Sequence, residues 1–168
     1  GKTLSSFLWA LDSFVREPAT EGTAATRVLY VSPLKALGVD VERNLRAPLV
    51  GITQTAAHQG RPVPRVRVGV RSGDTPAAER RRLQQDPPDI LITTPESLYL
   101  MLTSQARAAL TGVRTVIVDE VHAVAGTKRG AHLAVSLERL DALLDAPVQR
   151  IGLSATVEPA AEAVSYTH

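Results

Sequence analysis

The stretch VRTVIVDEVHAVAG, residues 113–126, places two carboxylates and an imidazole directly behind a run of aliphatic side chains. Asp119 ends the run, Glu120 follows it, and His122 comes two residues later. Carboxylates in this position either turn into solvent or hold a divalent cation at a reaction centre. Which of the two applies depends on whether another part of the chain needs a magnesium ion.

The first three residues, Gly1, Lys2 and Thr3, supply that need, because they match the end of a phosphate-binding loop, GxxxxGK[ST]. Glycine lets the backbone approach phosphates, Lys2 neutralises β- and γ-phosphate charge, and the Thr3 hydroxyl completes a Mg²⁺ shell. The tripeptide alone is weak evidence. With Asp119 as a second Mg²⁺ ligand and Glu120 to orient or deprotonate the attacking water, it predicts a site for a nucleoside triphosphate.

The apolar pattern predicts alternating helices and strands around these residues. Helical spacing indicates helices over 4–15 and 34–46, a helix capped by Thr75, a helix after Thr94-Pro95, and one over about 130–144. Short β-branched runs indicate strands within 27–33, 65–71, 89–94, 113–120 and 149–156, and the alternation at 65–71 is typical of a sheet edge. Such a succession predicts an α/β fold, a mostly parallel sheet with helices on both faces.

Polar residues follow all five predicted strands, and ligands bind at the carboxyl ends of strands in such sheets. The clusters are Ser32-Pro33, Ser72-Gly73-Asp74, Thr93-Thr94-Pro95-Glu96, Asp119-Glu120 and Ser154-Ala155-Thr156. We therefore expect them at one edge of the sheet. There His122 would lie near Ser154 and Thr156 and transmit the state of the γ-phosphate through hydrogen bonds.

Five segments of the chain resemble the motifs of superfamily 2 helicases in their DExH form. Gly1–Thr3, Asp119–His122 and Ser154–Thr156 are similar to motifs I, II and III, Ser32–Leu37 to motif Ia, and Thr94–Ser97 to motif Ib. The stretches SPLKAL, TTPESLYLML and DEVHAVAGTKRGAHLAVSLERL are most similar to the large helicase-related (Lhr) proteins. The resemblance covers nearly the whole chain.

The resemblance implies the first RecA-like domain of an ATP-driven 3′-to-5′ translocase acting on single-stranded DNA or RNA–DNA hybrids, often in DNA repair. The catalytic candidates are Lys2, Glu120 and His122, the ATP-binding ones Gly1, Lys2, Thr3, Asp119 and Glu120, and the Mg²⁺ ligands Thr3 and Asp119. Ser154, Ala155 and Thr156 are expected to couple hydrolysis to movement.

Contacts with nucleic acid should go to phosphates, because a motor must hold any base sequence. The candidates are Ser32, Pro33, Lys35, Gly73, Asp74, Thr75, Thr94, Pro95, Glu96 and Ser97. With two Phe, three Tyr and one Trp, base stacking is not expected to be the main grip, and Trp9 is assigned to packing. Arg80–Arg82 are assigned to a solvated helix face, whereas a functional contact of Lys128 and Arg129 stays open.

The composition is compatible with a nucleic-acid motor but does not by itself indicate one. The net charge of +2 gives no global basic field, cysteine is absent, and no apolar run reaches the roughly 20 residues of a membrane span. We expect a cytoplasmic protein whose residues 1–168 form a partial RecA-like domain, truncated at the phosphate-loop strand and inactive without a second RecA-like domain. The alternatives are a nucleic-acid-binding module without turnover and another phosphate-loop ATPase, such as a transporter subunit; the Thr94-Pro95-Glu96 segment and the lack of an LSGGQ-like stretch disfavour the latter.

Overall fold

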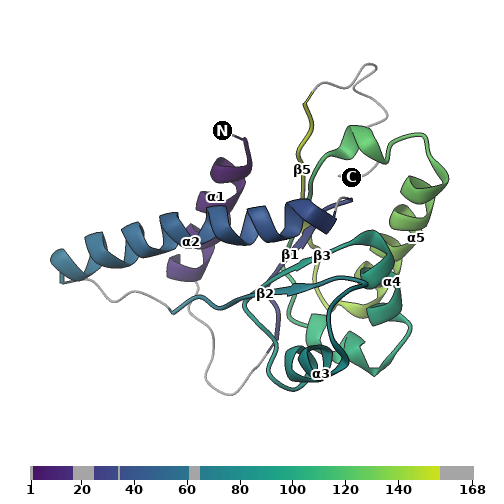
Figure 1. Cartoon of the computed structure of the whole chain (residues 1–168), viewed down its shortest axis with the longest axis horizontal. Helices are drawn as coiled ribbons and strands as arrows, with labels where there is room; N and C mark the ends of the chain where they lie inside the picture. Colours follow the sequence, from purple (N-terminus) through teal and green to yellow (C-terminus); the bar gives the residue numbers. More distant parts are fainter. Residues whose placement is uncertain (1, 17–24, 34, 61–64, 156–168) are drawn as a thin grey trace.

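The computed structural model of the chain describes residues 2–16, 25–33, 35–60 and 65–155, and it alternates helices with strands as predicted (Figure 1). In chain order the elements are α1 (Lys2–Arg16), β1 (Val28–Val31), α2 (Lys35–His58), β2 (Val68–Arg71), α3 (Ala77–Gln85), β3 (Ile90–Thr93), α4 (Pro95–Leu102), the 3-10 helix η1 (Gln105–Leu110), β4 (Thr115–Val118), the 3-10 helix η2 (Val121–Ala123), α5 (Lys128–Leu143) and β5 (Gln149–Gly152). None of the helices in these ranges is both long and apolar enough to cross a membrane.

The five described strands form one sheet in the order β2-β3-β1-β4-β5, with every neighbouring pair parallel. Their registers align the last residues of all five strands in one row: Arg71, Thr93, Val31, Val118 and Gly152. The polar clusters that follow the strands therefore start side by side. This confirms the predicted α/β fold class and the single edge on which the site was expected.

Helices cover both faces of the sheet (Figure 1). On one face, Leu29, Val31 and Val118 pack with residues of α4, η1 and α5 in one buried cluster. On the other face, Tyr30 and Ile117 pack with residues of α1 and α2 in a second cluster. Each strand of the sheet centre is therefore buried on both sides, which explains its uninterrupted apolar sequence.

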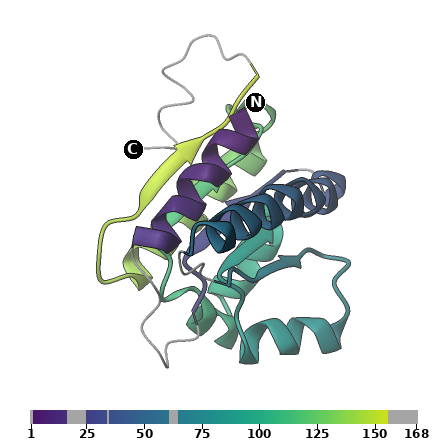
Figure 2. The same ribbon diagram turned by 90° about the vertical axis from the view of Figure 1, so that its left-hand side faces the viewer.

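The two outer strands are less buried than the three central ones. All four residues of β2 are half-buried, as predicted for a strand at an edge. At the opposite edge α1 runs beside β5 (Figure 2), where the Trp9 Nε1 atom donates a hydrogen bond of 2.9 Å to Gln149 Oε1. The assignment of Trp9 to packing was wrong, since Trp9 is 49% exposed next to this outer strand. The described strands pair without a gap, so any further strand would have to pair outside β2 or β5.

Two helix boundaries differ from the predictions. α2 passes Pro48 and continues to His58, because Leu49 and Ile52 beyond the proline still pack on the core. The predicted cap at Thr75 was wrong: Pro76 occupies the N-cap position of α3, and the Thr75 hydroxyl instead accepts a hydrogen bond of 2.8 Å from the Ser72 amide. In α2, packing on the core outweighs the helix-breaking tendency of proline. Before α3, a turn in the β2–α3 connection uses the Thr75 hydroxyl that the sequence assigned to capping.

Candidate nucleotide and nucleic-acid site

Lys2, at the start of α1, lies against the end of β5. Its Nζ atom donates hydrogen bonds to the carbonyl oxygens of Ser154 and Ala155, the latter at 3.0 Å. These residues are more than 150 positions apart, and they meet because α1 runs antiparallel to β5, with Lys2 at the end of the strand and Trp9 beside its first residue, Gln149. The segments that carry the first and last of the predicted motifs therefore share one corner of the sheet edge.

Tyr30 connects the start of α1 with the acidic pair behind β4. The Tyr30 hydroxyl donates a hydrogen bond to Asp119 Oδ2, and the Thr3 side chain is hydrogen-bonded to the same hydroxyl. The Glu120 amide donates to the other carboxylate oxygen of Asp119, Oδ1, at 2.9 Å. The two predicted magnesium ligands, Thr3 and Asp119, are thus held by one buried hydroxyl.

Sequence reasoning missed Tyr30, because it stands inside the apolar run VLYV and counts there as a core residue. Its ring does belong to the core, where it stacks on Phe7 with centroids 5.0 Å apart. Burial, and next the hydrogen bond to Asp119, raise the pKa of the Tyr30 hydroxyl, so it stays a neutral donor at physiological pH. A phenol one residue before the end of a buried strand was the available signal.

Glu120 and His122 follow Asp119 in the chain and contact each other. Glu120 adopts a left-handed backbone with φ of 48°, a conformation that is uncommon for residues other than glycine and concentrates at functional sites. His122 lies between Glu120 and the end of β5: Nε2 is 3.2 Å from Glu120 Oε2, and Nδ1 is 3.1 Å from Ser154 Oγ and accepts a hydrogen bond of 3.4 Å from the Ala155 amide. The predicted proximity of His122 to Ser154 is therefore present.

The donors at this edge suit Mg²⁺, which prefers hard oxygen ligands and takes only one or two from the protein when phosphates supply the rest. Thr3 contributes a hydroxyl and Asp119 a nearly buried carboxylate beside it. Within the described ranges no group of three or more His, Cys, Asp or Glu side chains could hold a metal ion. A protein-only metal cage is thus absent from this part of the chain, and a cation shared with a phosphate ligand fits the residues present.

The start of α4 belongs to the same edge, directly behind β3. The Thr94 hydroxyl accepts a hydrogen bond of 3.3 Å from the Ser97 amide, and Thr94 and Ser97 are both 4% exposed. Pro95 is the first helical residue, a position where its missing N–H costs no intrahelical bond. The two hydroxyls therefore cap and pack α4, which leaves the helix terminus itself as the candidate contact for a phosphate.

The turn behind β2 places two arginines at the edge. The Arg80 Nη2 atom donates to the carbonyl of Gly73 at 2.6 Å, which draws Arg80 back toward the turn. Burial, and next the charge of Arg80, lower the pKa of Arg71. The assignment of Arg80 to a solvated helix face was thus wrong, because its guanidinium lies beside Arg71 and the turn that Gly73, Asp74 and Thr75 form.

Several of the predicted site residues are buried, and others lie outside the residues that the structure describes. Ser32 and Pro33 are buried at the end of β1. Gly1 and Thr156 fall outside the described residues, as does the side chain of Lys35. Glu96 is exposed, and Arg129 of α5 donates to both of its carboxylate oxygens.

The hydrogen bond from Arg129 holds the pKa of Glu96 below its ordinary value. Because the folded-state pKa is the lower one, the ion pair contributes stability above the unfolded-state value of about 4.3. That contribution is lost as the pH falls through the folded-state pKa. At neutral pH the pair is fully charged.

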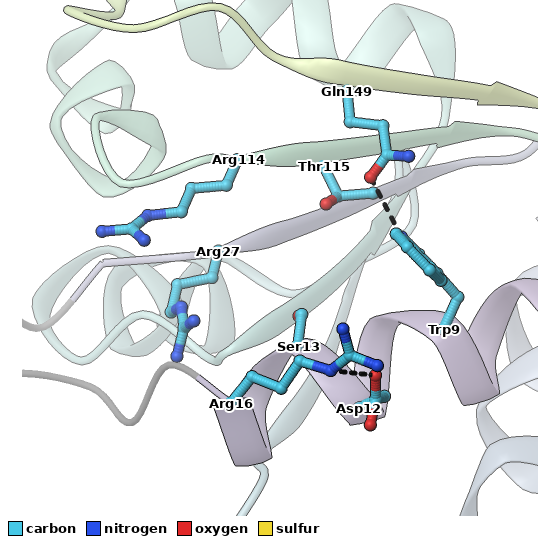
Figure 3. Close-up of a pocket in the computed structure, with 8 residues that line it drawn as sticks. All are labelled: Trp9, Asp12, Ser13, Arg16, Arg27, Arg114, Thr115 and Gln149. Carbon is cyan, nitrogen blue, oxygen red and sulfur yellow. Dashed lines mark hydrogen bonds and ion pairs between the residues drawn. The ribbon is translucent and has the colours of Figure 1, made fainter.

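A cavity of about 250 Å³ lies at the opposite edge, where the strands begin (Figure 3). Arg27 precedes β1, Arg114 precedes β4, and Gln149 opens β5, while Trp9 and Arg16 line the cavity from α1. Since the predicted motifs lie at the carboxyl ends of the strands, this cavity is separate from the candidate site.

A parallel sheet with Lys2 and Thr3 at one corner, and with Asp119 linked to Thr3 through the Tyr30 hydroxyl, defines a RecA-like nucleotide-binding domain of the helicase type. The chain belongs to the DEAD/DEAH box helicase family, whose family model matches residues 1–164. The similarity to Lhr proteins is confirmed as well: the Lhr helicase/probable uracil glycosylase of Mycolicibacterium smegmatis is 68% identical over 166 residues. The ATP-dependent helicase Lhr-Core of Methanothermobacter thermautotrophicus is 49% identical over 162 residues.

The solved structure of Mycobacterium smegmatis helicase Lhr bound to ssDNA and AMP-PNP superimposes with a TM-score of 0.91 at 66% identity. The match covers 99% of this chain and 21% of that chain. DEAD-box helicase Mss116, at 16% identity and a TM-score of 0.80, shares the fold. This chain covers 11% of the Mycolicibacterium relative and 18% of the Methanothermobacter one, so it corresponds to one part of such proteins.

Replacing Tyr30 with phenylalanine should test the bridge between Thr3 and Asp119. The new ring keeps the contact with Phe7, but the Oδ2 atom of Asp119, a residue 8% exposed, loses the Tyr30 donor, and an unsatisfied buried acceptor costs about 1–3 kcal/mol. Urea denaturation of the two proteins should show that loss in the free energy of unfolding. Tyr99→Phe is the control: the Tyr99 ring contacts His132, and its hydroxyl should matter by less than about 0.5 kcal/mol. Equal losses in both variants would contradict the role given to Tyr30.

Proposed function

We propose that the chain is the first RecA-like domain of an ATP-dependent helicase that moves along single-stranded nucleic acid. The observation that carries the proposal is the bridge from Thr3 through Tyr30 to Asp119, because it joins the phosphate-loop segment to the acidic pair. The family match and the Lhr relatives support the same assignment. The domain would occupy residues 1–168 of a longer protein, and a second RecA-like domain would complete the site.

In this proposal Lys2 neutralises the β- and γ-phosphates of ATP, while Thr3 and Asp119 are the protein ligands of Mg²⁺. The bound cation would supply charge neutralisation of the phosphates. Glu120 orients the attacking water and accepts its proton, since its carboxylate stands one residue beyond the metal ligand. Tyr30 positions Asp119 by occupying one of its oxygens, leaving lone pairs on both oxygens for the cation.

Ser154 and His122 would report the nucleotide state to the rest of the domain. Lys2 donates a hydrogen bond to the Ser154 carbonyl, and the His122 ring is hydrogen-bonded to the Ser154 hydroxyl. A phosphate that attracts Lys2 would compete with that carbonyl, and the change would reach His122 and Glu120 through one residue. Ala155 and Thr156 complete the coupling segment in the proposal.

Single-stranded DNA is the proposed partner, with an RNA–DNA hybrid as the alternative, and phosphates are the groups contacted. The α4 terminus at Thr94–Ser97, the turn at Gly73–Thr75, and Ser32, Pro33 and Lys35 follow three neighbouring strands, β3, β2 and β1. The similar Lhr structure was solved with ssDNA and AMP-PNP bound, which supports this choice. A cytoplasmic location and a role in DNA repair belong to the same proposal.

The test compares ATP hydrolysis by the full-length protein with and without single-stranded DNA. We expect DNA to stimulate hydrolysis, and the 168-residue chain alone to hydrolyse negligibly and to bind DNA weakly, with an affinity that falls as salt rises. If DNA leaves the rate of the full-length protein unchanged, the helicase assignment fails. DNA binding without any hydrolysis would instead favour a binding module.

A further inference from the structure

An ion pair joins the first turn of α4 to the first turn of α5. Arg129 donates through Nε to Glu96 Oε1 and through Nη2 to Oε2, the second at 3.0 Å. Two parallel bonds between a guanidinium and a carboxylate fix the orientation of the groups as well as their distance. The contact therefore holds two helix ends in a defined relation.

Each partner stands directly behind one half of the candidate site. Glu96 is two residues after Thr94, the N-cap of α4 at the nucleic-acid half. Arg129 is two residues after Thr127, the N-cap of α5, which ends the segment that starts at Asp119. Below the ion pair the two helices share one buried cluster, so a shift at one helix end is carried to the other.

The local sequence around Arg129 disagrees with ordinary helix chemistry. The first turn of α5 contains Lys128 and Arg129 and no acidic residue, although a helix N-terminus favours negative charge. Glu96 in the first turn of α4 follows the usual preference. The Arg129 charge is therefore offset by its partner on α4, and an arrangement that opposes local propensity in this way points to a role beyond the helix.

Folding stability does not account for the pair. The side chains of Arg129 and Glu96 are 37% and 54% exposed, and ion pairs with such exposure contribute little to stability. What the pair does specify is the position of the α4 terminus relative to the segment that carries Asp119 and Glu120. Position is the property that a coupling contact requires.

We propose that the Glu96–Arg129 ion pair couples the nucleotide half of the site to the nucleic-acid half, so that nucleotide binding tightens the grip of α4 on the strand. The proposal rests on the proposed function and deepens it. Glu96 then acts as a positioning residue for the α4 terminus, because its carboxylate is held by Arg129 and would repel a phosphate. Arg129 acts on nucleic acid through Glu96.

The experiment measures the dissociation constant of the full-length protein for single-stranded DNA, with and without AMP-PNP and Mg²⁺. The ratio of the two constants is the coupling factor, which is typically about 5- to 150-fold in coupled sites. Arg129→Gln should lower this factor about fivefold or more, toward one. Glu96→Gln and the double variant should give the same factor as Arg129→Gln, since all three remove the same contact.

Arg67→Gln is the matched control. Arg67 pairs with Asp86 at 2.6 Å, with side chains 43% and 64% exposed, and it precedes β2 at the edge away from the site. It should keep the coupling factor of the unsubstituted protein. Thermal melting of each variant completes the set, because a structural role alone would lower the melting temperature without changing the factor.

Two results with the variants would overturn the inference. The first is an unchanged coupling factor in Arg129→Gln, and the second is an equal fall in Arg67→Gln. If the unchanged factor comes with DNA binding weakened equally with and without AMP-PNP, Arg129 contacts the strand directly. If the unsubstituted protein binds both ligands with a factor of one, the coupling role fails alone, and if it binds neither, the proposed function fails with it.

Discussion

Glu120→Gln is expected to lower the rate of DNA-stimulated ATP hydrolysis by the full-length protein at least about 100-fold, the lower range of what a general base contributes. Glutamine keeps the length of the side chain and its reach toward His122, which lies 3.2 Å from the carboxylate. It cannot accept a proton from water. The affinity for ATP should therefore change little, and single-turnover hydrolysis should show the loss in the chemical step.

Glu138→Gln is the control for that experiment. Glu138 is an exposed acid of α5 whose only ion pair within the described ranges is a long one, 3.5 Å to Arg150. Its substitution should leave the rate unchanged. A Glu120→Gln protein that retains its activity would remove Glu120 from the chemistry and would require another base.

Leu137→Ala is expected to lower the free energy of unfolding by about 2–5 kcal/mol. Leu137 is 1% exposed and belongs to the cluster that packs α4 and α5 on the sheet. Truncating it opens a cavity that the neighbouring side chains fill only in part. Since domains of this size are stable by about 5–15 kcal/mol, the loss is a large fraction of the whole.

Urea denaturation followed by circular dichroism measures this loss, and Val135→Ala on the same helix is the control. Val135 is 53% exposed, and its truncation should change the free energy of unfolding by less than about 0.5 kcal/mol. Equal effects of the two substitutions would show that α5 does not pack on the sheet as described.

The fold was predictable because its strands are short, apolar and separated by helices. The runs VLYV, ILIT and TVIV are buried along their whole length, so burial on both faces left a parallel sheet as the consistent arrangement. The end of α2 was not predictable from propensity, since Pro48 is a local stop signal. Packing of Leu49 and Ile52 on the core, a tertiary contact, overrides it.

The part of the candidate site that directly follows the strand ends was predictable from the sequence. Spacing and topology were enough to expect Asp119, Glu120, His122 and Ser154 at one edge, where the aligned registers place them. Contacts made by side chains of ordinary type were not predictable. Tyr30 looked like a core aromatic, and the partner of Arg129 lies 33 residues away on another helix, so neither contact leaves a periodic signal.

The left-handed backbone at Glu120 lets the two adjacent acids, Asp119 and Glu120, contact different partners. By turning the chain sharply between adjacent acids, it directs Asp119 inward to a phenol and Glu120 outward to an imidazole. In the proposed function, metal holding and water activation then belong to consecutive residues that do not compete for the same partner. A valine or isoleucine at this corner would resist the bend, and the division of labour would be lost together with the carboxylate.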